Sequence, residues 1–135
     1  MANLSNCSSF MKKYEVCLKC RKRRYVIYKF DKCISKQGCD YVALIISLMK
    51  LILIECKRGR LGTGDFEDAM NQIEYTMNFF DKSPCNVDLI IICYERANPL
   101  VLRHINMLLR KPYKGRIRII LQRFKEKDSI CKFLH

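Results

Sequence analysis

The apolar run from Tyr41 to Ile54 constrains the fold of this chain more than any other feature, because charged residues bound it on both sides. β-Branched residues recur along the run and favour strands over one buried helix. The run is too short for a bilayer span, which needs about 20 residues, and Lys50 interrupts it. We therefore expect two strands that are connected near Leu48, Met49 and Lys50.

The register of this hairpin decides whether three polar side chains meet. If the connection has an even number of residues, Asp40 lies opposite Glu55 or Lys57, which share one face of their strand. An odd connection would pair Asp40 with Cys56 and separate the three side chains.

The even register predicts a metal site. Two neighbouring carboxylates repel each other and favour a hard cation such as Mg²⁺ or Mn²⁺, which takes oxygen ligands and can engage phosphate. Asp40 and Glu55 beside the ammonium of Lys57 are suited to hydrolysing a phosphodiester with a metal-activated water. No serine–histidine or cysteine–histidine pair is comparably placed, so covalent hydrolysis has little support.

The rest of the chain alternates helical and strand patterns without a repeat or a linker, so we expect one domain over 1–135. Asp65 can cap the second helix, and Asn98 with Pro99 can begin the third. The order predicts an α/β domain with a mixed central sheet flanked by helices. The expected elements are a helix over about 9–22, strands over 23–30 and within 40–57, a helix from 65, a strand over 86–94, a helix from 98 and a strand over 115–123.

The charge of the chain indicates a polyanionic partner. Its 26 Lys and Arg residues exceed its 13 Asp and Glu residues, which gives a formal charge of +13. Nucleic acid phosphate is the commonest partner for such a domain, although a basic surface can also serve solubility alone. No long basic amphipathic helix with bulky apolar anchors indicates a membrane surface. The first residues lack the apolar core of a secretory signal, so we expect an intracellular, cytoplasmic protein.

The chain has nine cysteines, and a reducing cytoplasm would keep most of them as thiols, hyperthermophiles being the known exception. Cys17 and Cys20 form a CxxC pair that invites a zinc interpretation. That interpretation is weak, because a structural site needs four ligands, no second CxxC follows, and the histidines are His104 and His135.

Asp40, followed by Ile-Glu-Cys-Lys at 54–57, resembles the signature of the PD-(D/E)xK nucleases. The resemblance covers roughly residues 9–121 and extends to the restriction-endonuclease-like α-βββ-α-β core of that superfamily. Within it the chain resembles the Holliday-junction resolvases of archaea and archaeal viruses, which are small, basic homodimers. Cys39 departs from the family pattern, which has a proline before the aspartate.

The resemblance implies roles for individual residues. Asp40, Glu55 and the backbone carbonyl of Cys56 would hold the metal, and Lys57 would attend the nucleophilic water. Gln72 resembles a glutamine that several of these nucleases carry, and Glu15 is the candidate for the first-helix glutamate of the resolvases. The residues expected to bind DNA are Arg21, Lys22, Arg23, Arg24, Ser35, Lys36, Arg58 and Arg60.

We therefore expect a Mg²⁺-dependent endodeoxyribonuclease that acts as a homodimer on branched DNA, as a Holliday-junction resolvase does in DNA recombination. Two alternatives stay open: a restriction-like or genome-degrading nuclease acting on linear duplex, and a catalytically inactive DNA-binding protein on the same fold. The C-terminal tail, with Ile130, Phe133 and Leu134, can pack on a partner subunit or on its own domain.

Overall fold

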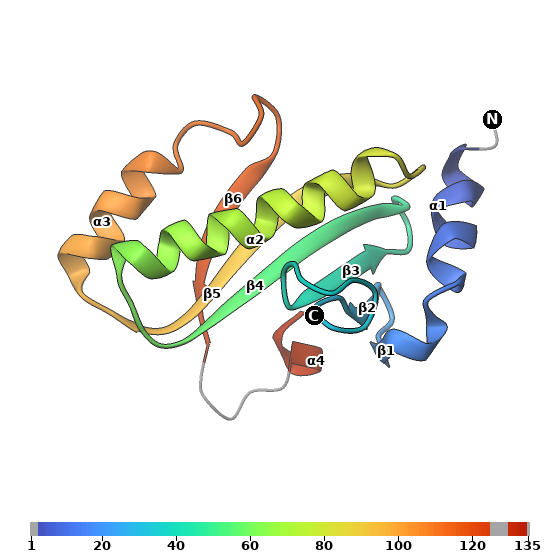
Figure 1. Ribbon diagram of the computed structural model, residues 1–135, viewed down its shortest axis with the longest axis horizontal. Coiled ribbons are helices and arrows are strands. Elements are labelled where there is room, and N and C mark those ends of the chain that lie inside the picture. The colour runs from blue at the N-terminus through green and yellow to red at the C-terminus, as the bar shows by residue number, and fades with distance from the viewer. Residues whose placement is uncertain (1–2, 125–129, 135) are drawn as a thin grey trace.

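Six strands form one mixed sheet in chain order among the residues that the computed structural model describes, which are 3–124 and 130–134 (Figure 1). The fold is therefore α/β with a central sheet flanked by helices, as expected. The elements are α1 (Asn3–Lys12), the 3-10 turn η1 (Glu15–Cys17), β1 (Leu18–Arg21), β2 (Tyr25–Lys29), β3 (Tyr41–Ile45), β4 (Lys50–Leu61), α2 (Thr63–Asp81), β5 (Asn86–Ala97), α3 (Pro99–Leu108), β6 (Arg118–Arg123) and α4 (Ile130–Phe133).

The sheet combines two kinds of strand pairing. β1 to β4 form an antiparallel meander, whereas β5 lies parallel to β4 and β6 lies parallel to β5. Parallel neighbours need a long crossover, and α2 and α3 supply the two crossovers. The antiparallel half thus meets the parallel half at β4, the strand that carries Glu55 and Lys57.

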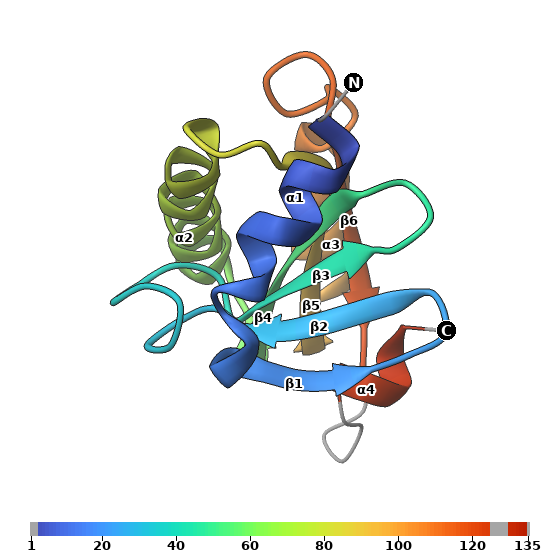
Figure 2. The same cartoon turned by 90° about the vertical axis from the view of Figure 1, so that its right-hand side faces the viewer.

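Both faces of the sheet are covered. α1 and α2 pack on one face, where α2 buries an apolar stripe that includes Ala69, Ile73 and Phe80. On the other face, Ile130 and Leu134 of the C-terminal segment pack against buried side chains of the sheet (Figure 2). The tail therefore packs on its own domain, one of the two expected arrangements. No helix within the described ranges is long and apolar enough to cross a membrane.

The prediction of a first helix over about 9–22 is wrong. α1 ends at Lys12, and residues 18–21 form β1, which pairs antiparallel with β2. The apolar residues of this segment are also compatible with a strand. Leu18 and Cys20 are the half-buried positions of an alternating strand pattern. Pairing with β2 satisfies the backbone there, and the tertiary contact overrides the local pattern.

The second helix also begins differently from the prediction. Asp65 occupies its third position, where the Oδ2 atom accepts a hydrogen bond from the backbone amide of Gly62 at 2.8 Å. The strand before the helix is longer than the predicted range, which ended at residue 57, because β4 continues to Leu61. Gly59 makes this possible: its φ of +78° allows the irregular register between Lys57 and Arg60.

Six cysteines form three disulfides, which corrects the expectation that most would be thiols. The bonds join Cys7 to Cys85, Cys17 to Cys33 and Cys20 to Cys131. The partners are up to 111 residues apart in sequence, so no local spacing could indicate them. Because Cys17 and Cys20 bond to different partners, the CxxC pair holds no zinc. Three cysteines stay free, namely Cys39, Cys56 and Cys93.

Candidate metal centre

The β3–β4 hairpin brings Asp40 and Glu55 together. The connection is residues 46–49, an even number, and the register pairs Tyr41 with Ile54. Asp40 and Glu55 are the next two residues beyond that pair, so they lie opposite each other on one face. The even register that the sequence left open is therefore the one the chain adopts.

Hydrogen bonds and an ion pair connect the three predicted side chains. The backbone amide of Asp40 donates to Oε1 of Glu55 at 3.1 Å, and the amide of Cys56 donates to Oδ2 of Asp40 at 2.7 Å. The Nζ atom of Lys57 lies 3.4 Å from Oε2 of Glu55. Asp40, Glu55 and Lys57 thus converge at one place, although they belong to two strands.

Burial gives Glu55 unusual electrostatics. The residue is only 4% exposed, on the face of β4 that α2 covers. Burial, the neighbouring charge of Asp40 and a hydrogen bond with that carboxyl raise the pKa of Glu55 to about 8, against the opposing effect of Lys57. At neutral pH the carboxyl of Glu55 is therefore largely protonated when no cation is bound.

The helix α2 fixes the segment that precedes Asp40. The backbone amide of Cys39 donates to Oγ1 of the fully buried Thr76 at 2.8 Å, and this hydroxyl donates to the carbonyl of Gln72 at 2.7 Å. Gly38 has a φ of +141°, and a Cβ atom there would lie 2.3 Å from the ring of Phe30. The approach of the chain to Asp40 is therefore held from two sides.

Cys39, in the place of the family's proline, is a core residue. Its Sγ atom donates to the carbonyl of Tyr41 at 3.3 Å. Burial raises the pKa of this thiol to about 12, so it stays protonated and unreactive.

Gln72 carries a buried acceptor without a partner. Its Oε1 atom is the only buried side-chain oxygen or nitrogen among the described residues that lacks a hydrogen bond. α2 runs back along β4 (Figure 1). Gln72 is therefore about 14 Å from the start of the helix, level with Lys57 at about 13 Å from the end of β4. The orphaned oxygen lies on the helix that covers Glu55, where a metal-bound water would be a donor for it.

The donor set fits a hard divalent cation. Two carboxylates supply oxygen, the carbonyl of Cys56 lies between Glu55 and Lys57 in sequence, and Gln72 offers an unused acceptor. Mg²⁺ is commonly held by one or two carboxylates while it keeps several waters. The described residues contain no group of three His, Cys, Asp or Glu side chains that could hold a metal.

Glu15 is not part of this group, which corrects its prediction as a ligand. It lies in the turn η1, its side chain is 57% exposed, and its Oε1 atom is 3.8 Å from an Nη atom of Arg21. The helix that would have carried it inward ends at Lys12. Glu15 therefore forms a surface ion pair with Arg21.

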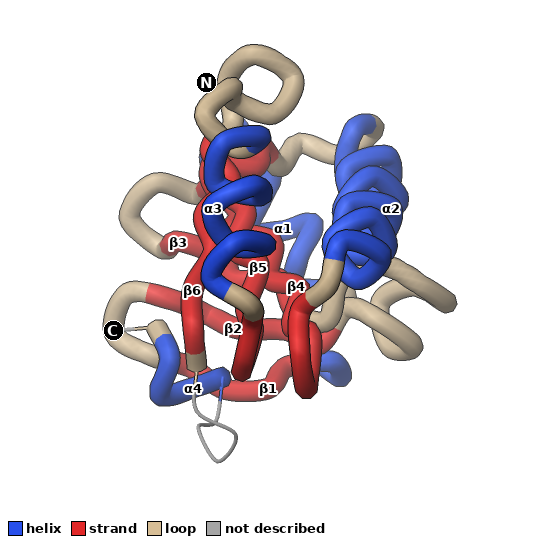
Figure 3. The backbone as a smooth tube through the Cα atoms, turned by 90° about the vertical axis from the view of Figure 1, so that its left-hand side faces the viewer, coloured by secondary structure: helices blue, strands red, loops and turns tan. Residues whose placement is uncertain are grey.

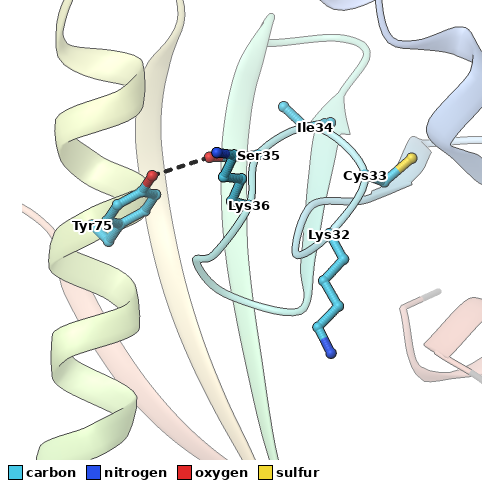
Figure 4. Close-up of a pocket in the computed structure, with 6 residues that line it drawn as sticks. All are labelled: Lys32, Cys33, Ile34, Ser35, Lys36 and Tyr75. Carbon is cyan, nitrogen blue, oxygen red and sulfur yellow. Dashed lines mark hydrogen bonds between the residues drawn. The ribbon is translucent and has the colours of Figure 1, made fainter.

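Four of the predicted DNA-binding residues lie near the carboxylates or on the strand that carries them. Arg58 and Arg60 are exposed in the part of β4 that follows Lys57. Ser35 and Lys36 line a hollow between the β2–β3 loop and α2, with the hydroxyl of Ser35 3.3 Å from that of Tyr75 (Figure 4).

The other four predicted DNA-binding residues lie at the opposite end of the sheet from the carboxylates. Tyr25, the residue that follows them, pairs with Ile45, whereas Asp40 lies beyond the pair of Lys29 and Tyr41. The five paired residues between these ends span about 16 Å. The residues concerned are Arg21, Lys22, Arg23 and Arg24.

Thr76 was not among the predicted site residues. Its hydroxyl accepts the hydrogen bond of the Cys39 amide, next to Asp40. A polar residue among the apolar positions of α2 was the available signal. Ala69, Ile73, Thr76 and Phe80 form one buried stripe, and a buried hydroxyl needs a partner from another element.

In comparisons with known proteins, no protein-family model, curated protein or solved structure matches the chain.

Proposed function

We propose that the chain is a metal-dependent DNA endonuclease that hydrolyses phosphodiester bonds in branched DNA such as a four-way junction. The observation that carries this proposal is the convergence of Asp40, Glu55 and Lys57 at the β3–β4 hairpin. This set matches the family signature that the sequence resembles, and it combines cation ligands with an ammonium group.

In the proposed mechanism Asp40, Glu55 and the carbonyl of Cys56 would hold Mg²⁺ or Mn²⁺. When bound, the ion would supply an activated water and neutralise charge that develops on the phosphate. Burial and the charge of Asp40 raise the pKa of Glu55, so this carboxyl would release its proton to solvent in order to hold the cation. Lys57 would orient the attacking water, and the Oε1 atom of Gln72 would accept a hydrogen bond from water in the site.

The basic exterior supports DNA as the substrate. A formal charge of +13 attracts phosphate, and Arg58, Arg60 and Lys36 are exposed on the elements that carry the carboxylates or lead to them. Symmetric incision of a four-way junction needs two sites, so we propose a homodimer. We propose that it acts in the cytoplasm of a hyperthermophile, or of such a host if the chain is viral, because that is the cytoplasm in which three disulfides persist.

A catalytically inactive DNA-binding protein is the second candidate, and one observation favours it. One oxygen of Asp40 and one of Glu55 already accept a backbone amide, and Lys57 pairs with Glu55. The cluster is thus satisfied without a cation, as a structural group would be. A nuclease for linear duplex would use the same residues and differs in substrate alone.

The three candidate functions can be distinguished by digesting a labelled four-way junction and its component duplexes, with and without Mg²⁺. Junction cleavage that requires Mg²⁺ supports the proposal, and equal cleavage of the duplexes supports the linear-duplex nuclease. DNA binding without cleavage, and without heat from Mg²⁺ in calorimetry, supports the inactive protein.

A further inference from the structure

Two turns lie side by side at the end of the sheet away from the carboxylates (Figure 2). The β1–β2 turn holds residues 22–24, and the β3–β4 turn holds residues 46–49. The backbone amide of Ile46 donates to the carbonyl of Arg24 at 3.1 Å, which joins the two turns. We call these two segments together the tip surface.

The tip surface presents apolar side chains beside cations. Ile46 is 39% exposed and Leu48 is 50% exposed. Lys22, Arg23 and Arg24 are exposed, and the described residues provide no carboxylate within 4.0 Å of them. The neighbouring cations Arg21 and Lys50 do have such partners, in Glu15 and Asp88.

The folding of the hairpin does not explain these residues. Short hairpin connections favour Asn, Asp and Gly. These residues adopt the required backbone conformations and expose no large apolar side chain to water. This connection instead reads Ile-Ser-Leu-Met, and Met49 adopts a φ of +53°. An ordinary side chain at positive φ is uncommon. Exposed apolar residues in such a turn, beside cations that no carboxylate of the described residues pairs with, indicate a binding surface.

We propose that the tip surface binds DNA at a branch point, with the three cations on the sugar-phosphate backbone and with Ile46 and Leu48 against base faces that the branch leaves unstacked. This inference rests on the proposed function for the identity of the ligand and deepens it by naming a second contact on the same DNA. Apolar side chains are used in this way where proteins kink or open a base step.

The sizes of the two effects favour a branch over intact duplex. Covering the exposed part of either side chain adds about tenfold in affinity. Opening an intact stacked step costs at least as much as the two side chains return. The gain is therefore retained where stacking is already interrupted.

The small apolar area of Ile46 and Leu48 disfavours an anionic membrane as the partner. A myristoyl chain has several times the apolar surface of these two side chains and still binds a bilayer only marginally. Charge complementarity with phosphate remains, and the backbone of a branched DNA supplies it beside exposed base faces.

Ile46 of the tip surface is six residues beyond Asp40 along an extended strand. At the rise of a strand, the two residues are therefore about 20 Å apart. One DNA molecule of several base pairs can therefore contact both places. Since no described residue of the tip surface belongs to the metal centre, binding at the tip can be changed without changing the site of cleavage.

The test measures DNA binding in EDTA, so that cleavage does not interfere. The variant Ile46→Ser/Leu48→Ser is compared with the parent on a four-way junction carrying 2-aminopurine at the branch and on a linear duplex of the same sequence. Leu100→Ser/Met107→Ser is the matched control, because those two side chains are 68% and 57% exposed on α3 (Figure 3).

We expect the tip variant to lose at least about tenfold in junction affinity, with duplex affinity and thermal midpoint unchanged, and to lose the 2-aminopurine signal of the parent. The control should behave as the parent does. Arg23→Gln/Arg24→Gln should weaken binding to both DNAs and lower the salt slope by about 2.

Several results would overturn the inference. These are parent-like junction affinity in the tip variant, equal losses on duplex, a dimer that becomes a monomer in sedimentation, or tip-dependent binding to phosphatidylserine vesicles in place of junction DNA. If junction binding depends on the tip but Mg²⁺ supports no cleavage, the nuclease proposal fails and this one stands. If cleavage occurs and the tip variant binds normally, the reverse holds.

Discussion

The backbone amide of Asp40 donates a hydrogen bond to Oε1 of Glu55, and the amide that follows Glu55 returns one to Oδ2 of Asp40. This reciprocal pair connects the first residue before β3 with the buried end of the apolar part of β4. It holds two carboxyl groups together where burial and like charge both disfavour full ionisation.

Without divalent ions, the pH dependence of stability should carry the signature of Glu55. The carboxyl titrates near 4.5 when unperturbed and near 8 in the folded protein. The folded state therefore binds more protons between these values, and the free energy of unfolding falls as pH rises from about 5 to about 8. Glu55→Gln should flatten that fall, measured by thermal unfolding in EDTA. An equal slope in parent and variant would contradict the raised pKa.

Gln72→Leu should change stability and activity in opposite directions. Removing a buried acceptor that lacks a donor stabilises the protein without metal by up to about 1 kcal/mol. The same change removes the acceptor for a metal-bound water, so cleavage should slow by about tenfold or more. Chemical denaturation and single-turnover cleavage measure the two effects. Asn71→Leu, at the exposed neighbouring position, is the control. A loss of stability in Gln72→Leu would show that the oxygen has a partner in solution.

Thr76→Val should destabilise the protein by about 1–3 kcal/mol, because the buried amide of Cys39 loses its acceptor while the shape of the side chain is kept. Thr76→Ser retains the hydroxyl and should lose much less of its unfolding free energy. The Val variant should also bind Mg²⁺ more weakly in calorimetry, since the segment before Asp40 is released. Equal stabilities of the Val and Ser variants would show that this hydrogen bond does not hold the segment.

Alkylation of the unfolded, unreduced protein should modify three thiols, those of Cys39, Cys56 and Cys93. Reduction beforehand should raise the count to nine, the number of cysteines in the sequence. Replacing both Cys7 and Cys85 by Ser should lower the free energy of unfolding by about 2–4 kcal/mol, because that bond closes a long loop. Mass spectrometry gives the counts, and more than three modified thiols without reduction would contradict the pairing.

The local patterns in the sequence predicted most of the elements and the candidate site. The β-branched residues of the apolar run indicated the hairpin. The resemblance to the nuclease signature pointed to Asp40 and Glu55, while the register that decides whether they meet stayed open until the pairing of β3 with β4. The sequence signal is clear where a strand buried on both faces gives a continuous apolar run, as in β5, or where a helix that covers a sheet gives an apolar stripe, as in α2.

Features that depend on distant contacts could not be predicted in this way. β1 forms because β2 and two disulfides hold residues 17–21, and those bonds join positions with no common pattern. The prediction of Glu15 as a metal ligand was wrong for the same reason, because it depended on a helix that continues past Lys12. The position of Arg23 and Arg24 at the far end of the sheet follows from strand direction, which composition does not indicate.

The most direct test of the central claim is single-turnover cleavage of a four-way DNA junction in Mg²⁺ by the parent, Glu55→Gln and Lys57→Ala, with the exposed Lys19→Ala as the control. The claim predicts cleavage by the parent and the control, and a loss of at least about a hundredfold in the two site variants, with junction affinity within a few-fold of the parent. Site variants that cut as fast as the parent, or a parent that does not cut with the ion present, would contradict it.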